Sequence, residues 1–284
     1  MYLFKRKEEL ERHLTTARNN GKHIGFVPTM GALHRGHISL INAAKENSEL
    51  VVCSIFVNPT QFNDPKDFEK YPVTIDQDVQ MLTEAGCDVL FLPTVQEMYP
   101  DGLTAKMHYD FGSLETVLEG AARPGHFQGV GQVVHQLLNL VQPDKLFMGQ
   151  KDLQQCLIIN RLLKIIDSQV ELVICPTVRE KDGLAMSSRN LRLNATEREN
   201  ALHLYKGLSE IKHNYQQANL KTLKEKVVNE LKTSGFEVDY VELISILEDG
   251  SVIFPDTAAT SPLYAVVAAK ELSSGVRLID NIAL

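Results

Sequence analysis

Two histidines in the first part of the chain, His34 and His37, are the residues best placed to do chemistry. They lie in the segment PTMGALHRGH (residues 28–37), directly after a buried apolar run. The HxGH spacing spans about one helical turn, so both imidazoles can point at the same place. Imidazoles donate hydrogen bonds to phosphate oxygens or move a proton near neutral pH. We therefore expect a phosphate-binding helix start, where Gly31 and Gly36 let the backbone approach the ligand.

A second candidate is the triplet Ser187-Ser188-Arg189, which follows Met186 in a long polar stretch. Serine hydroxyls donate hydrogen bonds, and a guanidinium binds oxygens in pairs, so the triplet suits a mobile clamp on a triphosphate. Alone, such a triplet is typical of any surface loop. Its specificity comes from its combination with HxGH. The GxGxxG pattern of dehydrogenase-type dinucleotide sites is absent from the sequence.

Alternating strands and helices are predicted to position both motifs. Runs that are apolar throughout predict buried parallel strands at 23–29, 50–58, 88–93, 144–149 and 170–176. Amphipathic patterns between them predict helices at 38–47, 74–85, 131–141 and 152–166, and Gly86 fits a C-cap. This alternation indicates an α/β fold with a Rossmann-like, doubly wound parallel sheet. Ligands of such sheets collect at the carboxyl ends of the strands.

The pattern changes after about residue 177. A polar stretch (179–199) leads into predicted helices at 196–215 and 220–234, with Asn194 or Thr196 as the N-cap of the first. Strands are predicted at 238–245, 263–272 and 276–284, and the SSG between the last two indicates an antiparallel hairpin. We expect a Rossmann-like domain over residues 1–177. A second, smaller α+β domain over residues 178–284 would carry the Ser-Ser-Arg loop.

Composition excludes several classes of protein. The 284 residues carry 36 acidic and 29 basic side chains, a net charge of -7, which disfavours a dedicated nucleic-acid binder. We expect neither a signal peptide nor a membrane span, because the N-terminus lacks an apolar h-region and no apolar run approaches ~18 residues. Cys53, Cys87, Cys156 and Cys175 lie in or beside apolar runs without a CxxC pair. They are predicted to be buried reduced thiols, as in a cytoplasmic protein.

The segment of residues 186–189 is similar to a KMSKS loop. Together with HxGH, it resembles the signature pair of the nucleotidylyltransferase superfamily. Longer segments narrow the resemblance. In order along residues 28–190 they are PTMGALHRGH, FVNPTQFN, EKYP, RPGHFQGV, FMGQKDLQQ and VREKDGLAMSSRN. They resemble the pantothenate synthetase (pantoate–beta-alanine ligase) family. One departure is Val73, where the family usually has arginine, and this leaves the effect on a polar contact near the substrate loop open.

The resemblance implies ATP-dependent condensation of (R)-pantoate with β-alanine to pantothenate through a pantoyl adenylate, with release of AMP and pyrophosphate. This is a step of vitamin B5 and coenzyme A biosynthesis. It also implies an ATP site composed of Met30, Gly31, Ala32, Leu33, His34, Arg35, Gly36, His37, Gly149, Gln150, Lys151, Asp152, Val178, Met186, Ser187, Ser188 and Arg189. His37, His34, Lys151 and Arg189 would be catalytic, and His37 is the implied proton donor.

Individual roles follow from the same resemblance. Lys151 would bind phosphate, Asp152 the ribose hydroxyls, and the backbone of Val178 the adenine. Gln61 would bind pantoate and β-alanine, and Gln155 would bind pantoate.

Two further residues, Arg123 and His126, belong to a matching segment, and their roles stay open between substrate contact and support of the loop. Mg²⁺ is expected to bridge phosphate oxygens, with no protein side chain assigned as a metal ligand. As in the dimeric family, we expect a homodimer, with the apolar strand region 51–57 continuing across the subunit boundary.

Three alternatives use the same signatures. A nucleotidylyltransferase that adenylates a phosphate shares HxGH but needs no carboxylate pocket around Gln61 and Gln155. An aminoacyl-tRNA synthetase shares both motifs. However, a length of 284 residues leaves no room for an anticodon-binding domain, and a net charge of -7 gives no evident basic face. A nucleotide sensor without turnover is the third, and AMP release would separate it from an enzyme.

Overall fold

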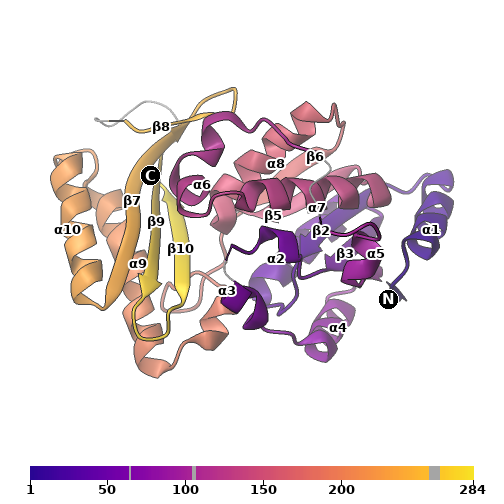
Figure 1. Cartoon of the computed structure of the whole chain (residues 1–284), viewed down its shortest axis with the longest axis horizontal. Coiled ribbons are helices and arrows are strands. Elements are labelled where there is room, and N and C mark those ends of the chain that lie inside the picture. Colours follow the sequence, from indigo (N-terminus) through magenta and orange to yellow (C-terminus); the bar gives the residue numbers. More distant parts are fainter. Residues whose placement is uncertain (64, 104–106, 256–262) are drawn as a thin grey trace.

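A parallel sheet of six strands forms the larger part of the molecule (Figure 1). The computed structural model describes residues 1–63, 65–103, 107–255 and 263–284. The strands are β1 (Tyr2–Phe4), β2 (Ile24–Thr29), β3 (Leu50–Ile55), β4 (Val89–Phe91), β5 (Lys145–Gly149) and β6 (Glu171–Cys175), in the spatial order β1-β4-β3-β2-β5-β6. The doubly wound parallel sheet predicted from the apolar runs is confirmed.

The strand order reverses between β2 and β5, because β3 and β4 lie on one side of β2 while β5 and β6 lie on the other. Beyond the carboxyl ends of strands at such a reversal, loops diverge and leave a crevice. The segment 30–37 follows β2, and residues 150–155 follow β5. Both predicted nucleotide-binding segments therefore meet at this switch point.

A second, antiparallel sheet lies beside the first and has the order β10-β9-β7-β8. Its strands are β7 (Phe236–Ile246), β8 (Val252–Ile253), β9 (Leu263–Glu271) and β10 (Arg277–Ala283). The predicted hairpin joins β9 to β10, with Arg277 opposite Lys270. Helices α9 (Ala195–Asn214) and α10 (Leu220–Thr233) cover its outer face (Figure 1). Asn194 is the N-cap of α9 and shares a capping box with Glu197, which decides between the two predicted caps.

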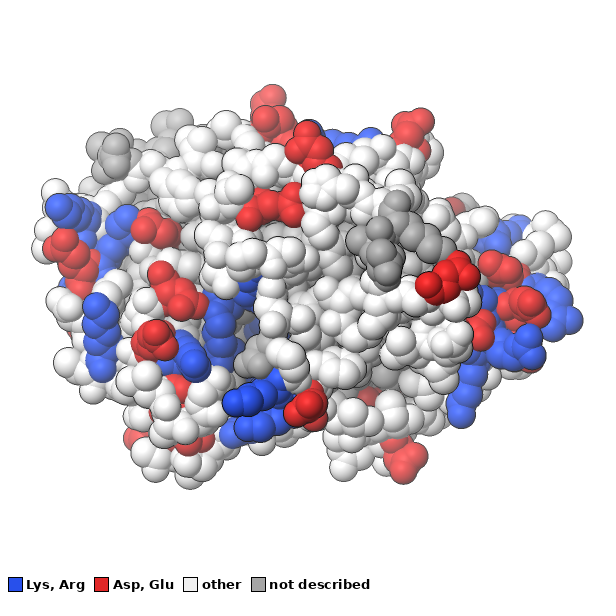
Figure 2. All heavy atoms as spheres, viewed as in Figure 1, with Lys and Arg blue, Asp and Glu red and all other residues white. Residues whose placement is uncertain are grey.

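Charged side chains of both signs are mixed on the face seen in Figure 2. They gather over α10 and β7 at one end and around α1 (Lys7–Asn19) at the other, while the centre is largely uncharged. This face therefore shows no broad basic surface of the kind that nucleic-acid binders use. No helix in the described ranges is long and apolar enough to span a membrane.

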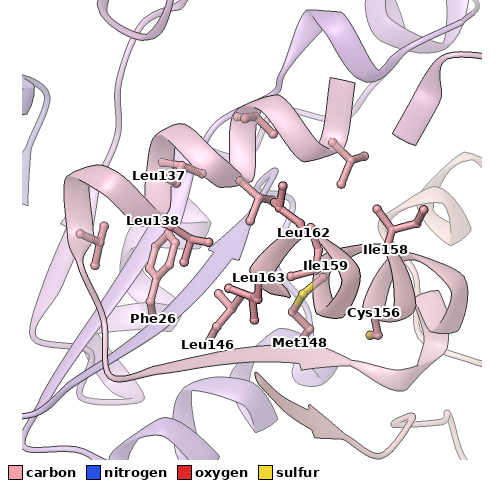
Figure 3. Close-up of a cluster of buried hydrophobic side chains, with 14 of the residues drawn as sticks. Phe26, Leu137, Leu138, Leu146, Met148, Cys156, Ile158, Ile159, Leu162 and Leu163 are labelled. Atoms are coloured by element: carbon pink, nitrogen blue, oxygen red, sulfur yellow. The ribbon is translucent and has the colours of Figure 1, made fainter. Parts of the chain in front are cut away.

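Helices cover both faces of the large sheet. α2 (Arg35–Asn47) and α4 (Ile75–Glu84) pack on one face, and α1 (Lys7–Asn19), α7 (His126–Val141) and α8 (Leu153–Ile165) pack on the other. Figure 3 shows Leu138 of α7 and Ile159 and Leu162 of α8 packed over Leu146 of β5. Gly86 adopts a φ of 74° directly after α4, as expected of a C-cap glycine.

The inner face of the second sheet joins this same core. Ile244 of β7 and Val266 of β9 are buried against the α7–α8 layer, whereas Ala265 and Val267 face α9 and α10. Alternation along each strand therefore gives the second sheet two buried faces. The division of the chain at residue 177 stays a prediction.

The start of α7 was predicted wrongly. The helix begins at His126 rather than at Gly131. Gly129 and Gly131 lower helix propensity and so hid its first turn from the sequence pattern. Gly129 serves close packing instead, because a Cβ there would lie 2.3 Å from the Thr60 carbonyl oxygen.

Several short or exposed elements were not predicted. They are β1, α1, β8, α3 (Pro65–Glu69), α5 (Val95–Met98), α6 (Leu118–Ala122) and four 3-10 turns at Pro59–Gln61, Gly112–Glu115, Gln150–Asp152 and Ser188–Arg192. β1 has no buried residue, and the N-cap of α1 makes no side-chain hydrogen bond, so neither gives a strong sequence signal.

The expected dimer contact through residues 51–57 is wrong as far as the strand itself is concerned. β3 pairs with β2 on one edge and β4 on the other, so its backbone cannot extend the sheet into another subunit. Its uniform burial reflects an interior position in the sheet.

Candidate active site

A cavity of about 260 Å³ opens at the switch point and reaches the second sheet. Segments after β2, β3, β5 and β6 line it together with the first half of α7. The predicted site residues among its lining are Met30, His34, Gly36, His37, Gln61, Gly149, Lys151, Asp152, Gln155, Val178, Met186, Ser187, Ser188 and Arg189. The structure thus gathers residues from four separate sequence motifs around one space.

Five predicted ATP-site residues lie outside the cavity lining. They are Gly31, Ala32, Leu33, Arg35 and Gln150. The first three form the turn beneath the histidines. The exposed Arg35 pairs with Glu180 at 2.8 Å, and the Gln150 amide bonds to Asn281 at 3.2 Å.

The two histidines cap their own helix. His34 is the N-cap of α2, and its Nδ1 accepts from the Gly36 N–H at 3.2 Å. The His34 N–H donates to Nδ1 of His37 at 3.3 Å, and the rings lie 4.1 Å apart. Since both Nδ1 atoms accept from the backbone, each ring carries its proton on Nε2. Gly36 is required here, because a Cβ would lie 2.9 Å from the His34 ring.

Both rings are neutral near pH 7. Burial and the Lys151 ammonium lower the pKa of His34 to about 4. Burial and the neighbouring His34 lower the pKa of His37 to about 3. The pair therefore offers Nε2–H donors rather than positive charge to a ligand.

A buried carboxylate beneath the site holds the turn in place. Asp78 of α4 accepts from the Ala32 N–H at 3.0 Å, the Leu33 N–H at 2.8 Å and the Thr74 hydroxyl at 3.0 Å. Ala32 adopts a left-handed φ of 47°, which costs energy for a residue with a Cβ. The carboxylate compensates by satisfying two backbone donors of that strained turn.

Two opposite charges lie side by side after β5. Lys151 Nζ lies 3.2 Å from Asp152 Oδ1, and their side chains are 17% and 46% exposed. Burial opposes ionisation of Asp152, but the Lys151 ammonium outweighs it and holds the pKa below its usual value. Asp152 is therefore a carboxylate and Lys151 has a partner before any ligand arrives.

The Ser-Ser-Arg loop contacts the turn after β2 and helix α3. The Ser188 hydroxyl donates to the Ala32 carbonyl at 2.9 Å, and the Ser187 hydroxyl caps the turn by accepting from the Arg189 N–H at 3.3 Å. Asp67 of α3 pairs with Arg189 at 2.8 Å and with Arg192 at 2.7 Å. The loop is thus seated against α3 and the turn after β2.

Gln61 presents its side chain to the cavity from the turn after β3. Its Oε1 accepts from Asn58 Nδ2 at 3.3 Å, and its Nε2 lies 2.8 Å from the Met30 sulfur. Asn58 is buried and is held in turn by the Gly129 carbonyl and the Tyr99 hydroxyl. These contacts fix the direction of the Gln61 amide.

The two adjacent glutamines of α8 have different surroundings. Gln154 is buried and its amide bonds to the Glu119 N–H and to the carbonyls of Leu114 and Val117. Gln155 lines the cavity, and its amide makes no hydrogen bond to the chain within the described ranges. Gln155 is therefore the glutamine whose amide is available in the cavity, and its binding of pantoate stays a prediction.

Arg123 and His126 support Gln61 from behind. His126 Nδ1 donates to the Gln61 carbonyl at 2.7 Å, and Arg123 donates to that carbonyl at 3.3 Å and to His126 Nε2 at 3.1 Å. Burial and the Arg123 charge lower the pKa of His126 to about 3. Burial and the nearby Arg189 lower the pKa of Arg123 to about 10. Both residues thus help to orient the backbone of Gln61.

The segment after β6 carries one free backbone donor and one buried hydroxyl. The Val178 carbonyl accepts from the Met186 N–H at 3.0 Å, while the Val178 N–H has no partner in the described part of the chain. Thr177 Oγ1 lines the cavity, is buried, and likewise has no partner there. Buried polar atoms are normally satisfied, so the Thr177 hydroxyl points to a ligand, and the Val178 N–H beside it is free to donate to one.

Sequence reasoning missed the residues that support the site. Asp78 and Asp67 contact the motif residues Ala32 and Arg189, which lie 46 and 122 positions away in the sequence, so only the fold brings them together. Val73 is 70% exposed and lies outside the cavity lining, so the departure from the family pattern sits at the surface. Within the described ranges, no three His, Cys, Asp or Glu side chains form a group that could hold a metal ion.

The chain is similar to enzymes of one family. The family model described as pantoate-beta-alanine ligase matches residues 2–283. Pantothenate synthetase from Cytophaga hutchinsonii is 42% identical over 282 residues, covering 98% of this chain and 97% of that protein. The crystal structure of pantothenate synthetase from Thermus thermophilus superposes with a TM-score of 0.90 at 37% identity, covering 99% of each chain.

A second crystal structure carries ligands. It is the pantoate-beta-alanine ligase from Francisella tularensis complexed with beta-gamma ATP and beta-alanine. It superposes with a TM-score of 0.83 at 35% identity, covering 100% of this chain and 97% of that one.

The chain therefore belongs to the pantoate–beta-alanine ligase family. It is an AMP-forming ligase, and its reaction is the family's ATP-dependent condensation of pantoate with β-alanine in pantothenate biosynthesis.

Proposed function

We propose that the cavity at the switch point carries out both half-reactions, with phosphate donors on one side and a neutral amide pocket on the other. The observation that carries this proposal is that Gln61 and Gln155 line the same cavity as the two histidines, Lys151 and Arg189. Fixed cations bind the carboxylate of a nucleophile strongly and hold it back, whereas amides orient it without neutralising it.

ATP is proposed to lie across the carboxyl ends of β2 and β5. The Nε2–H groups of His34 and His37 and the ammonium of Lys151 would donate to phosphate oxygens. Ser187 and Arg189 would close over the triphosphate from the loop. The free Val178 N–H would donate a hydrogen bond to the adenine, and the Asp152 carboxylate would accept hydrogen bonds from the ribose hydroxyls.

In the first half-reaction, the pantoate carboxylate attacks the α-phosphorus of ATP. A C–O–P bond forms while the bond to pyrophosphate breaks. The barrier comes from bringing two anions together and from charge on the leaving group, so positioned donors and cations supply most of the catalysis. Because the imidazoles are neutral, we assign them to hydrogen bonding, and the charge to Lys151 and Arg189.

In the second half-reaction, the β-alanine amine attacks the activated acyl carbon and AMP leaves with the bonding electrons. No thiol takes part in this scheme. All four cysteines are buried and none lines the cavity, and burial raises the pKa of each thiol. A pocket closed by the Ser-Ser-Arg loop would protect the adenylate from water.

Mg²⁺ is proposed to accompany the triphosphate. This ion usually keeps phosphate oxygens and water among its ligands, and no protein side chain is assigned to it here because Asp152 is assigned to the ribose hydroxyls. When bound, it would neutralise charge on the phosphates.

Three further proposals concern the whole protein. We propose that residues 1–177 and 178–284 form two domains, that the chain works as a homodimer, and that it acts in the cytoplasm. The dimer and the location rest on the resemblance to the family, and the dimer is tested by sedimentation, where a species of 31.8 kDa would contradict it.

The central test follows pyrophosphate release from ATP and Mg²⁺. We expect release only with pantoate present, and sustained AMP formation only after β-alanine is added. Pyrophosphate release at the same rate with and without pantoate would contradict the assignment of the cavity to pantoate. Phosphate-bearing acceptors would then be screened for the nucleotidylyltransferase alternative.

A further inference from the structure

A buried carboxylate of α6 joins the second sheet to the substrate cavity. The Glu119 carboxylate accepts hydrogen bonds from both terminal nitrogens of Arg277, at 2.6 and 2.7 Å, and from the Tyr240 hydroxyl at 2.8 Å. Arg277 lies on β10 and Tyr240 on β7. Arg277 also donates from Nε to Asp239 at 2.6 Å, which fixes the plane of the guanidinium. The pair is buried and bidentate, so it holds α6 firmly against the second sheet.

The same residue reaches the pantoate-facing glutamines by two routes. Its carboxylate lies 3.9 Å from Arg123, whose guanidinium donates to the Gln61 carbonyl at 3.3 Å. Its backbone N–H donates to the Gln154 amide at 2.9 Å, and Gln154 directly precedes Gln155 on α8. Both glutamines are therefore attached to supports that meet at Glu119.

A separate contact serves the nucleotide side. The Asn281 amide of β10 donates to the carbonyls of Gln150 and Lys151, both at 2.9 Å, and Arg179 holds Asp280 beside it with contacts of 2.6 and 2.9 Å. Two sets of polar contacts thus connect the second sheet with residues of the cavity. One leads to the glutamines, and the other leads to the turn that carries Lys151.

We propose that Glu119 is a positioning residue for the pantoate half of the site, through which the second sheet orients Gln61 and Gln155. The proposal rests on the assignment of these glutamines to pantoate. Asn281 is its counterpart for the nucleotide half. Loss of either contact changes the affinity for one substrate and leaves the other unchanged.

The test measures binding of pantoate and of ATP by calorimetry, together with KM for each substrate. Tyr240→Phe removes one hydrogen bond to Glu119 and keeps the ion pair, so the chain still folds. Arg277→Lys keeps the charge but loses the paired contact. We expect each to weaken pantoate binding about tenfold, with ATP binding unchanged. Asn281→Ala is the matched control, and we expect it to weaken ATP binding about tenfold and leave pantoate unchanged.

Two results would overturn the inference. One is an equal loss of both affinities in the Tyr240 and Arg277 variants, which is what general loosening of the fold produces. The other is no loss of pantoate affinity in either. Gln61→Ala distinguishes failure of the glutamine assignment from failure of the role of Glu119. If it binds pantoate like the parent chain, the assignment of the glutamines fails and the role of Glu119 fails with it. If it loses pantoate affinity while neither Tyr240→Phe nor Arg277→Lys does, only the role of Glu119 fails.

Discussion

Neighbouring residues of the same type perform different tasks in this site, and the glutamine pair of α8 shows how burial decides between them. Gln154 satisfies three backbone groups inside the protein, whereas Gln155 faces the cavity with its amide free of contacts to the described residues. The sequence offers two identical side chains, and only the direction of each on the helix separates the supporting glutamine from the one proposed to bind pantoate.

This difference predicts opposite phenotypes. Gln155→Ala should lose pantoate affinity by about tenfold or more and keep its stability, because a ligand contact is removed. Gln154→Ala should lose about 1–3 kcal/mol of unfolding free energy, because buried backbone groups are left unpaired. Calorimetric binding and urea unfolding of both variants check this. Equal loss of stability in the two variants would contradict the assignment.

The buried histidine below Gln61 makes stability depend on pH. The pKa of His126 is about 3 in the folded chain and near 6.5 when unfolded, so below pH 6.5 the unfolded chain binds a proton that the folded chain refuses. Stability therefore falls as pH falls from about 7 towards 3. One such histidine accounts for about 2 kcal/mol between pH 7 and 5.

Replacing that histidine removes its share of the pH dependence. We expect the drop in unfolding free energy from pH 7 to 5 to be about 2 kcal/mol smaller in His126→Gln than in the parent chain. Urea unfolding at both pH values measures it. His213→Gln, on an exposed position of α9, controls for the loss of a histidine as such. An unchanged drop in His126→Gln would show that the folded chain accepts the proton.

At the scale of elements, the turn after β2 depends on a helix that the motif does not contain. Asp78 of α4 uses both carboxylate oxygens, one for each of two backbone N–H groups of the turn. An amide in its place offers one oxygen and turns an N–H₂ group towards a backbone donor.

We therefore expect Asp78→Asn to weaken ATP binding about tenfold through displacement of His34 and His37. Asp76→Asn, an exposed neighbour on the same helix, is the matched control and should bind ATP normally. Titration calorimetry with ATP compares the two. Normal binding by the Asp78 variant would mean that the turn holds its shape without this carboxylate.

How much the sequence predicts depends on the range of the interactions. The strands β2 to β6 and the helices α2, α4, α8, α9 and α10 form close to their predicted positions, because their apolar periodicity is local. The motif residues also converge as predicted, since the ends of parallel strands share one edge. Asp67, Asp78 and Glu119 escaped prediction because each acts on residues distant in the sequence. The start of α7 was missed because Gly129 has a low helix propensity. Glycine lies there because the close approach of the Thr60 carbonyl leaves no room for a Cβ.

At the scale of the whole molecule, one core serves both sheets. Ile244 and Val266 of the second sheet are buried in the same cluster as the side chains of α7 and α8. The second sheet's face that carries these two residues is buried against the layer of α7 and α8. The two sheets are therefore expected to unfold together.

Calorimetry of two matched variants tests this cooperativity. Leu208→Ala removes a buried side chain of α9, which packs on the outer face of the second sheet. Ile244→Ala removes a side chain of the cluster that the second sheet shares with α7 and α8. Each should lower the stability of a single transition by about 2–5 kcal/mol. A Leu208→Ala trace that splits into an early and a late peak would show that the parts unfold independently.

The burial of all four thiols has a practical consequence for spectroscopy. Cys53, Cys87, Cys156 and Cys175 are buried, so we expect them to react slowly with alkylating reagents in the folded state and to give little background labelling. The substitution Val73→Cys, at a position that is 70% exposed and lies outside the cavity lining, would supply a thiol free to take a fluorophore. The segment beside the Ser-Ser-Arg loop could then be watched in real time as substrates arrive, without first rebuilding the core to remove its own cysteines.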